Sequence, residues 1–294
     1  MSHATEQSAD QPGFISRQVR EAQRFFLNLR PADHAGLTVA CGGWEQCADD
    51  YEIHRSGFPF LSLEYVARGE GRVTLDGRSY ALLPGTVFAY DASVPHDIDA
   101  APGSGLVKYF VDFSGRRGRT LLSKAGVPPG GIAQVSPAHD AEMLFEQLVH
   151  NGCDNSRFTS DICRALLECL LLKIAETRIP YGSASSGAFI TYRQCRHYLE
   201  QHFLTLQSMR ELARCCHLDK AYLCRLFKRY DRQSPYQLLV RLKMNWAAAQ
   251  LQNPDRLVKQ VARELGYDDA GHFSRTFKRV YGVSPQRFRG PRGR

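Results

Sequence analysis

The chain has 294 residues, of which 43% are hydrophobic, and a formal net charge of +8. That length allows one large domain or two ordinary ones, each with a buried core. No apolar run approaches the roughly 18 residues of a membrane-spanning helix, and residues 1–13 lack the apolar segment of a secretion signal, so we expect a cytoplasmic protein that stays out of membranes.

The net positive charge is confined to the C-terminal part of the chain. Residues 1–188 carry a net charge of −5, from 17 Lys and Arg against 22 Asp and Glu, whereas residues 189–294 carry +13, from 21 against 8. This asymmetry favours a polyanion as partner of the C-terminal part, because phosphate contacts supply much of the affinity for DNA. The nine cysteines are odd in number and contain no C-x-x-C pair, so neither a disulfide framework nor a common zinc site is predicted.

The first 35 residues are interpreted as an N-terminal arm. Residues up to Gly13 are polar, and we expect no fixed structure there. Residues 14–29 are more apolar, with Phe25, Phe26 and Leu29 near their end. They are interpreted either as a short helix or as a segment that docks elsewhere on the protein.

Residues 36–115 show the alternation of apolar and polar side chains that is typical of short β-strands. Residues 61–65 alternate in this way and predict a half-buried strand. Asp76-Gly77 lies between two further strand-like runs and predicts a tight hairpin of type I′. Several short strands at this spacing predict a small β-sandwich or barrel.

Three motifs in this region carry a resemblance. The run from Arg68-Gly-Glu-Gly71 through Leu83-Pro-Gly85 to Val94-Pro-His96 is similar to the cupin-like sensing domain of sugar-responsive AraC-type regulators. The resemblance implies that residues 36–178 form a domain that binds a small-molecule effector and mediates dimerisation.

A metal site, which many cupins contain, is not expected. Glu64 and Gly71 fit the end of the cupin metal motif, but Gly57 and Pro59 stand at its two histidine positions, and only His96 could match the distal ligand. Two potential ligands are too few for a closed or a catalytic metal site. We therefore expect no metal and no cofactor.

A concave, mostly apolar pocket with a few polar groups is expected inside the barrel. The candidate effector-binding residues are Arg68, His96, Lys108 and Phe110. A cation beside an aromatic wall suits a sugar, a related polyol or a carboxylic acid, through hydrogen bonds and ring stacking. Two alternatives stay open: Arg68 could be a surface charge at the mouth of a hairpin, and His96 could be a core or rim histidine.

Helical periodicity follows, over residues 139–150 and 159–177. The second of these helices carries a broad apolar stripe, and its candidate dimerisation residues are Leu166, Leu167, Leu170, Leu171 and Ile174. One edge of the stripe could cover the barrel while the other pairs with a second copy of the chain; a purely internal role is the alternative. Residues 181–187 are rich in Gly and Ser and predict a flexible linker, which we place at residues 179–188.

The C-terminal part, residues 189–294, contains one phrase twice. Tyr222-Leu-Cys-Arg-Leu-Phe-Lys-Arg-Tyr-Asp-Arg-Gln-Ser-Pro235 recurs fifty positions later as His272-Phe-Ser-Arg-Thr-Phe-Lys-Arg-Val-Tyr-Gly-Val-Ser-Pro285. In each copy apolar side chains recur at helical spacing on one face, and an arginine stands among small or polar residues on the other. Each copy is therefore predicted to be a short helix, a tight turn and a second helix.

The stretch from Thr191 to Gly290 resembles the DNA-binding domain of the AraC/XylS family of transcription regulators. Residues 265–289 match the family signature almost continuously, reading Leu265-Gly-Tyr-Asp-Asp-Ala-Gly-His-Phe-Ser-Arg-Thr-Phe-Lys-Arg-Val-Tyr-Gly-Val-Ser-Pro-Gln-Arg-Phe-Arg289. The resemblance implies an all-α domain with two helix-turn-helix units joined by a long helix. One departure is Asp231-Arg232, which stands where many members have glycine after the first recognition helix.

Two sets of side chains are candidates for DNA contact. Arginine can bond two acceptors of a guanine edge in the major groove, so the face around each arginine is predicted to read bases. The base-reading set is Lys220, Ala221, Cys224, Arg225, Gly271, Ser274 and Arg275, and the phosphate-binding set is Lys228, Arg229, Lys278, Arg279, Arg287 and Arg289. For one such helix alone a merely solvated face is the simpler interpretation, and two copies in register weaken it.

The sequence thus predicts an α+β protein of two domains that regulates transcription by ligand-responsive, sequence-specific DNA binding. The expected partners are double-stranded DNA, a small-molecule effector, a second copy of the chain and, for an activator, RNA polymerase. The alternatives are a metal-dependent cupin enzyme or an alkyl-transfer repair protein fused to such a DNA-binding domain. The first lacks its histidines, and the second would need a Pro-Cys-His phrase that does not occur, so no catalytic residue is assigned.

Overall fold

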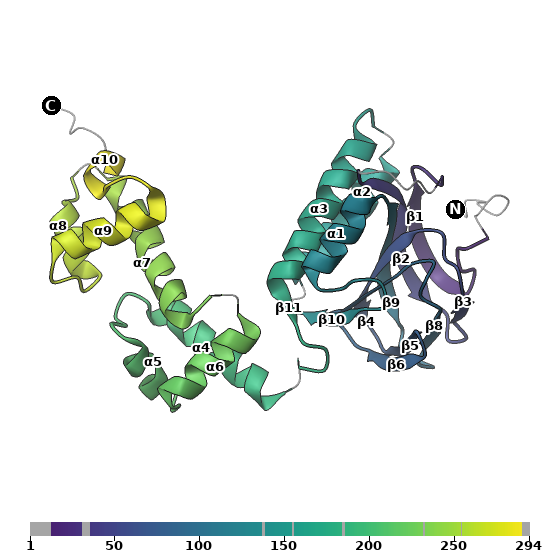
Figure 1. The fold of residues 1–294 in the computed structure, drawn as a ribbon, viewed down its shortest axis with the longest axis horizontal. Coiled ribbons are helices and arrows are strands. Elements are labelled where there is room, and N and C mark those ends of the chain that lie inside the picture. The colour runs from purple at the N-terminus through teal and green to yellow at the C-terminus, as the bar shows by residue number, and fades with distance from the viewer. Residues whose placement is uncertain are drawn as a thin grey trace, which may run out of the picture. The chain divides into compact units, whose positions relative to one another are not determined.

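The computed structural model describes residues 13–30, 36–136, 139–154, 156–183, 186–231, 233–253 and 255–289. They fall into two compact units, Met1–Ala184 and Ser185–Arg294, and each unit has its own hydrophobic core (Figure 1). No helix within these ranges is both long and apolar enough to span a bilayer.

The N-terminal unit is built on two antiparallel β-sheets. The larger has the strand order β1-β2-β9-β4-β7-β10-β11 and the smaller the order β3-β8-β5-β6. The strands of the larger sheet are β1 (Val19–Phe26), β2 (Thr38–Cys47), β4 (Leu61–Arg68), β7 (Thr86–Tyr90), β9 (Val107–Ser114), β10 (Ile132–Val135) and β11 (Arg178–Ile179). Those of the smaller are β3 (Glu52–Arg55), β5 (Gly71–Leu75), β6 (Arg78–Leu82) and β8 (His96–Ala100). Apolar side chains of both sheets meet in one core, which makes the predicted sheet-rich domain.

The structure confirms the predicted hairpin and selects one of the two alternatives at the N-terminus. Asp76 and Gly77 have φ of 48° and 74°, which is the type I′ geometry that was predicted. Residues 19–26 are not a helix. They dock on the sheet, which was the other alternative, as strand β1 paired with β2 along the edge of the larger sheet. Residues 61–66 are buried on both faces of β4, where a half-buried strand was predicted.

Three helices cover the second face of β4 and so explain why the strand is buried on both faces. Helices α1 (Arg116–Ala125), α2 (His139–Cys153) and α3 (Thr159–Thr177) cover the face of the larger sheet that is turned away from the smaller one (Figure 1). The predicted dimerisation residues Leu167, Leu170, Leu171 and Ile174 are fully buried in this core, and Leu166 is partly buried against it. Their assignment to a dimer contact is wrong, because the broad apolar stripe of α3 packs against the core of its own domain.

The C-terminal unit is entirely helical within the described residues. Its elements are α4 (Gly187–His202), α5 (Met209–Cys215), α6 (Lys220–Tyr230), α7 (Pro235–Leu251), α8 (Val258–Glu264), α9 (Ala270–Tyr281) and α10 (Pro285–Arg289). Helices α4, α5 and α6 contact one another, as do α8, α9 and α10 with their neighbours, and α7 contacts members of both groups. The long bridging helix α7 follows Ser234, its N-cap residue, which forms a capping box with Gln237.

The two repeated units close their turns in the same way. His217 and Gly266 both adopt left-handed backbone, with φ of 54° and 76°. The next amide then bonds back into the preceding helix, from Leu218 to the Ala213 carbonyl at 2.8 Å and from Tyr267 to the Ala262 carbonyl at 2.9 Å. A turn that glycine makes freely is thus imposed on a histidine in the first unit.

The ends of the two recognition helices differ. Helix α9 ends at Gly282 with φ of 77°, whereas α6 ends at Asp231 in extended backbone with φ of −123°. The Asp231 carboxylate accepts a hydrogen bond from the Tyr192 hydroxyl at 2.9 Å and lies 3.3 Å from Arg196, both on α4. Asp231 therefore fastens the end of α6 to α4, a function that glycine could not perform.

Candidate nucleic-acid interface and effector chamber

Helix α6 presents every cation and small residue that was assigned to it. Its N-terminus is fixed by Asp219, whose carboxylate accepts from the Ala221 and Tyr222 amides at 2.8 and 3.1 Å. The exposed residues are Lys220, Ala221, Cys224, Arg225, Lys228 and Arg229. The Arg225 guanidinium lies 5.6 Å from the centre of the Tyr222 ring and has no carboxylate within ion-pair distance in the described part of the chain. Its hydrogen-bond donors are therefore available to a ligand.

Helix α9 repeats this arrangement with smaller side chains. Asp269 accepts from the Gly271 and His272 amides at 2.7 and 2.9 Å, and these hydrogen bonds lower its pKa. Arg275 is exposed and lies 3.3 Å from the same carboxylate, in a solvent-exposed pair of the kind that contributes little to stability. Gly271 and Ser274 are half-buried, and Ser274 donates to the Ala270 carbonyl at 2.8 Å. Arg275 can leave this pair for a stronger acceptor.

The remaining phosphate-binding candidates do not all project freely. Lys278, Arg279 and Arg287 are exposed. Arg289 is half-buried and donates to the Arg256 carbonyl at 3.1 Å, so it holds α10 against the segment before α8. The solvent-facing cations of α6 and α9, which are Lys220, Arg225, Lys228, Arg229, Arg275, Lys278 and Arg279, are called the recognition faces below.

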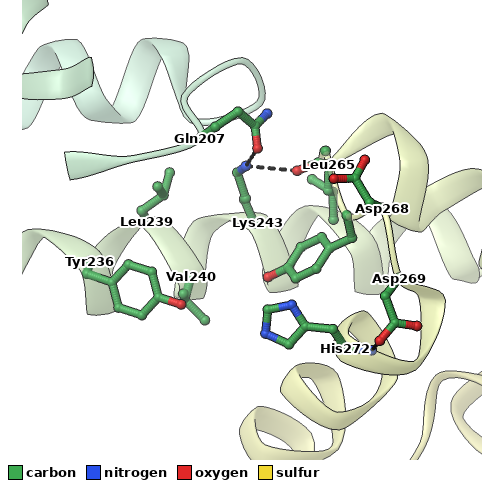
Figure 2. Close-up of a pocket in the computed structure, with 11 residues that line it drawn as sticks. Gln207, Tyr236, Leu239, Val240, Lys243, Leu265, Asp268, Asp269 and His272 are labelled. Carbon is green, nitrogen blue, oxygen red and sulfur yellow. Dashed lines mark hydrogen bonds between the residues drawn. The ribbon is translucent and has the colours of Figure 1, made fainter. Parts of the chain in front are cut away.

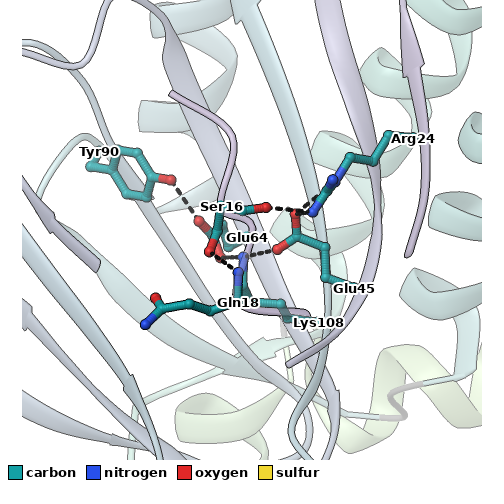
Figure 3. Close-up of polar contacts among 7 residues, drawn as sticks. All are labelled: Ser16, Gln18, Arg24, Glu45, Glu64, Tyr90 and Lys108. Carbon is teal, nitrogen blue, oxygen red and sulfur yellow. Dashed lines mark hydrogen bonds and ion pairs between the residues drawn. The ribbon is translucent and has the colours of Figure 1, made fainter. Parts of the chain in front are cut away.

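The interior of the N-terminal unit is organised around Lys108 of β9. Its ammonium group lies 3.1 Å from Glu45 and 2.9 Å from Glu64, and it is 3% exposed (Figure 3). Burial alone would lower the pKa of Lys108, but the two carboxylates raise it well above its ordinary value. The Tyr90 hydroxyl donates to Glu64 at 2.5 Å. This buried network consists of groups that recognise hydroxyls as well as charges.

The N-terminal segment closes the chamber around this network. Arg24 bonds Glu45 at 3.0 Å through Nε and the Ser16 carbonyl at 2.9 Å through Nη2 (Figure 3). Phe14 packs edge-on against the Phe58 ring, with 5.7 Å between centroids. The cavity that remains has a volume of about 20 Å³ and is lined by Phe14, Ile15, Ser16, Glu45, Tyr51, Arg55, Phe58, Glu64, Tyr90, Lys108, Phe110 and Asp112. A cavity of this size holds about one water molecule.

Two of the four predicted effector residues line this chamber and two do not. Lys108 and Phe110 lie on its wall. Arg68 is exposed at the end of β4, because a β-bulge between Val66 and Arg68 shifts the register and changes the face on which it emerges. His96 is 1% exposed and stacks on the Tyr90 ring at 3.7 Å, which is the core position left open as an alternative. Assigning these two residues to the pocket wall was wrong.

Sequence analysis did not assign the N-terminal segment or the carboxylates to the chamber, and it considered Glu64 only as a metal ligand. Glu45, Glu64 and Asp112 are each nearly fully buried and lie on three different strands. Their juxtaposition follows from the strand order β2-β9-β4, which alternation of side chains along one strand does not reveal. No group of three or more potential metal ligands occurs among the described residues.

Asp112 provides a test of this interior. Its Oδ1 atom has no hydrogen-bond partner in the described structure, and burial raises its pKa to about 7. A raised carboxyl pKa stabilises the fold at low pH, and that stability is lost as pH rises through the folded value. The Asp112→Asn variant should therefore lose less free energy of unfolding than the wild type between about pH 5 and pH 8. Urea unfolding at several pH values measures this difference, and parallel curves would contradict it.

Both parts of the chain resemble domains of known proteins. Residues 42–172 match the family model described as an AraC-like ligand binding domain, and residues 212–290 match a helix-turn-helix domain. The probable transcriptional regulator LumQ of Photobacterium leiognathi is 30% identical over 238 residues, or 80% of this chain and 90% of that protein. The MmsAB operon regulatory protein of Pseudomonas aeruginosa is 24% identical over 82% of this chain and 79% of its own length. The lactose operon transcription activator of Staphylococcus xylosus is 20% identical over 77% of this chain and 82% of its own length.

Proposed function

Because the chain belongs to the AraC family of transcriptional regulators, we propose that both recognition faces bind one DNA duplex and that a neutral sugar or polyol in the N-terminal chamber controls this binding. The protein is a DNA-binding regulator with a ligand-binding domain, and its relatives are regulators, not enzymes. The observation that carries the proposal is the duplicated cationic face on α6 and α9, each beginning at a capping aspartate.

Each recognition face suits one major groove of B-DNA. Two successive major grooves on one side of a duplex lie about 34 Å apart, and a helix enters each with its N-terminal residues towards the bases. Arg225 and Arg275 stand in the second turns of α6 and α9, on their N-terminal halves, and are assigned to base reading. The lysines and arginines of the last turns are assigned to phosphates, which position a protein without reading sequence.

Replacing Arg275 by Ala should weaken binding to the preferred duplex by roughly 1 to 3 kcal/mol and relax the preference at one base pair. Lys278→Ala is the matched control on the same helix, and it should weaken binding to all sequences alike. Fluorescence anisotropy with single-base variants of the duplex, at several salt concentrations, separates the two effects. An equal loss on every sequence for Arg275→Ala would show that it contacts only the backbone.

The chemistry of the chamber favours a neutral ligand over an acid. Glu45, Glu64 and Asp112 supply carboxylate oxygens, which accept hydrogen bonds from hydroxyls. Lys108 is already paired with two of them, so an anionic ligand would have to break those buried ion pairs. A relative that bears the name of the lactose operon agrees with this choice. Because the cavity is far smaller than a monosaccharide, entry requires Phe14 and its neighbours to leave the opening.

A panel of neutral sugars and polyols, tested beside sugar acids and aromatic acids, should contain a neutral ligand that raises the melting temperature. Glu64→Gln should abolish that response, since it removes the charged acceptor facing the ligand. Phe14→Ala should enlarge it, because less of the binding energy goes into displacing the arm. A response to acids alone would overturn the assignment of a neutral effector.

The dimer surface is proposed on the exposed edge of α3, in place of its buried stripe. Ile162, Ala165, Cys169 and Leu172 are exposed and follow one another at intervals of three, four and three residues. That spacing is the one by which two helices pair in a coiled coil. A second copy of the chain is the proposed occupant of this edge.

Leu172→Asp should convert the dimer to a monomer, because two copies would place like charges in one apolar seam. Light scattering at micromolar concentration gives the mass, and Ser160→Asp on the exposed side of the same helix is the control. A short bismaleimide should also cross-link the wild type through Cys169, and Cys169→Ser should remove this product. A wild type of monomeric mass would contradict the proposal.

Two further parts of the proposal follow from DNA as the partner. We place the protein in the cytoplasm, where a bacterial operon lies, and we include RNA polymerase as a partner if the protein activates transcription. The Staphylococcus xylosus relative is named an activator.

A further inference from the structure

Lys243 lies inside the DNA-binding unit rather than on its surface. It belongs to α7, and only 5% of the residue is exposed. Its ammonium group donates to the Leu265 carbonyl at 2.8 Å and to the Gln207 side-chain oxygen at 3.4 Å (Figure 2). No carboxylate lies within ion-pair distance of it among the described residues. The charged ammonium group of Lys243 therefore donates its hydrogen bonds to two neutral oxygens.

Such a position is unfavourable for a lysine that serves only the core. Burial lowers the pKa of Lys243, which reflects the cost of removing the ammonium group from water. An apolar side chain would fill the same space on α7 without that cost. What the lysine adds is a pair of directional hydrogen bonds, and these join parts of the chain that are far apart in sequence.

The two hydrogen bonds link both halves of the domain. Gln207 lies in the segment before α5 of the first helix-turn-helix unit, and Leu265 lies in the turn between α8 and α9 of the second. The Gln207 amide also rests on Gly266, since a Cβ at that position would lie 2.3 Å from it. Gln207, Lys243 and Gly266 thus form one contact, called the bridge below, between unit one, α7 and unit two.

Helix α7 contacts both halves of the domain, but the space next to the bridge is open. A cavity of about 290 Å³ opens there, lined by Gln207 of unit one, by Tyr236, Leu239, Val240 and Lys243 of α7, and by residues 265–269 and His272 of unit two (Figure 2). At this point open space separates residues of unit one from residues of unit two. The polar bridge therefore carries the constraint that apolar packing does not supply at this point.

We propose that the bridge sets the separation and angle of the two recognition helices and so determines which half-site spacing the protein accepts. This inference rests on the proposed binding of both recognition faces to one duplex. Linking two binding modules raises affinity only when the linker matches the span of the sites. One extra base pair moves the second site by about 3.4 Å along the axis and about 35° around it. A rigid bridge resists that displacement, whereas a loosened one follows it.

The test compares Lys243→Met with the wild type on three duplexes. A duplex with two half-sites is first selected from a random pool with the wild-type protein, and variants then receive one inserted base pair or lose one half-site. The inserted pair should weaken wild-type binding by about tenfold or more, and this penalty should shrink severalfold in Lys243→Met. Affinity for the single half-site should be the same for both proteins. Lys259→Met, an exposed lysine of α8, is the matched control and should behave as the wild type.

The other possible results contradict either the inference about the bridge or the proposed two-groove binding. An insertion penalty that is equal in Lys243→Met and the wild type overturns the inference. Equal weakening on the single half-site and the full duplex also overturns it, because the lysine then serves only folding. If Lys243→Met does not fold by circular dichroism, Gln207→Ala takes its place with the same readout. Recovery of only single half-sites by the wild type would instead sink the proposed two-groove binding, and the bridge with it.

Discussion

The burial of phenyl rings fixes the direction of the positive charge in this protein. Phe227 of α6 and Phe277 of α9 are fully buried, and Phe277 contacts the rings of Tyr281 and Phe288 at 4.7 and 5.4 Å. Rotating either helix would expose a phenyl group, at a cost of about 2 kcal/mol or more. Arg225 and Arg275 precede these rings by two residues, about half a turn around the helix, and therefore lie on the solvent-facing side. Apolar packing thus decides the geometry of a polar interface.

Two buried lysines show how differently the two units handle charge. Lys108 sits between Glu45 and Glu64, and its pKa is raised. Lys243 has only a carbonyl and an amide, and its pKa is lowered. The first arrangement is a charge-compensated polar interior, which is the site proposed above for a neutral ligand. The second joins two segments that are far apart in sequence. The surroundings of each ammonium group, and not its burial alone, therefore decide the direction of its pKa shift.

Sequence periodicity predicted what depends on neighbouring residues and missed what depends on strand order. The duplicated phrase predicted both helix-turn-helix units, and Asp76-Gly77 predicted its hairpin, because caps, turns and helical faces are local. Strand β1 was missed since its apolar residues resemble those of a helix end. Arg68 was misplaced by a bulge that no residue type announces. The leucines of α3 were misassigned because a broad stripe does not say which edge the chain itself covers. The carboxylates around Lys108 meet only after β2, β9 and β4 have paired.

The unequal exits of α6 and α9 have a consequence for symmetry. Asp231 fastens the first recognition helix to α4, while Gly282 turns the chain away so that α10 packs beside α9. The repeats are therefore alike in the helices that they offer and unlike in what supports them. A single chain has a head and a tail, and it would lie on a duplex with a defined polarity even where the two half-sites were identical in sequence.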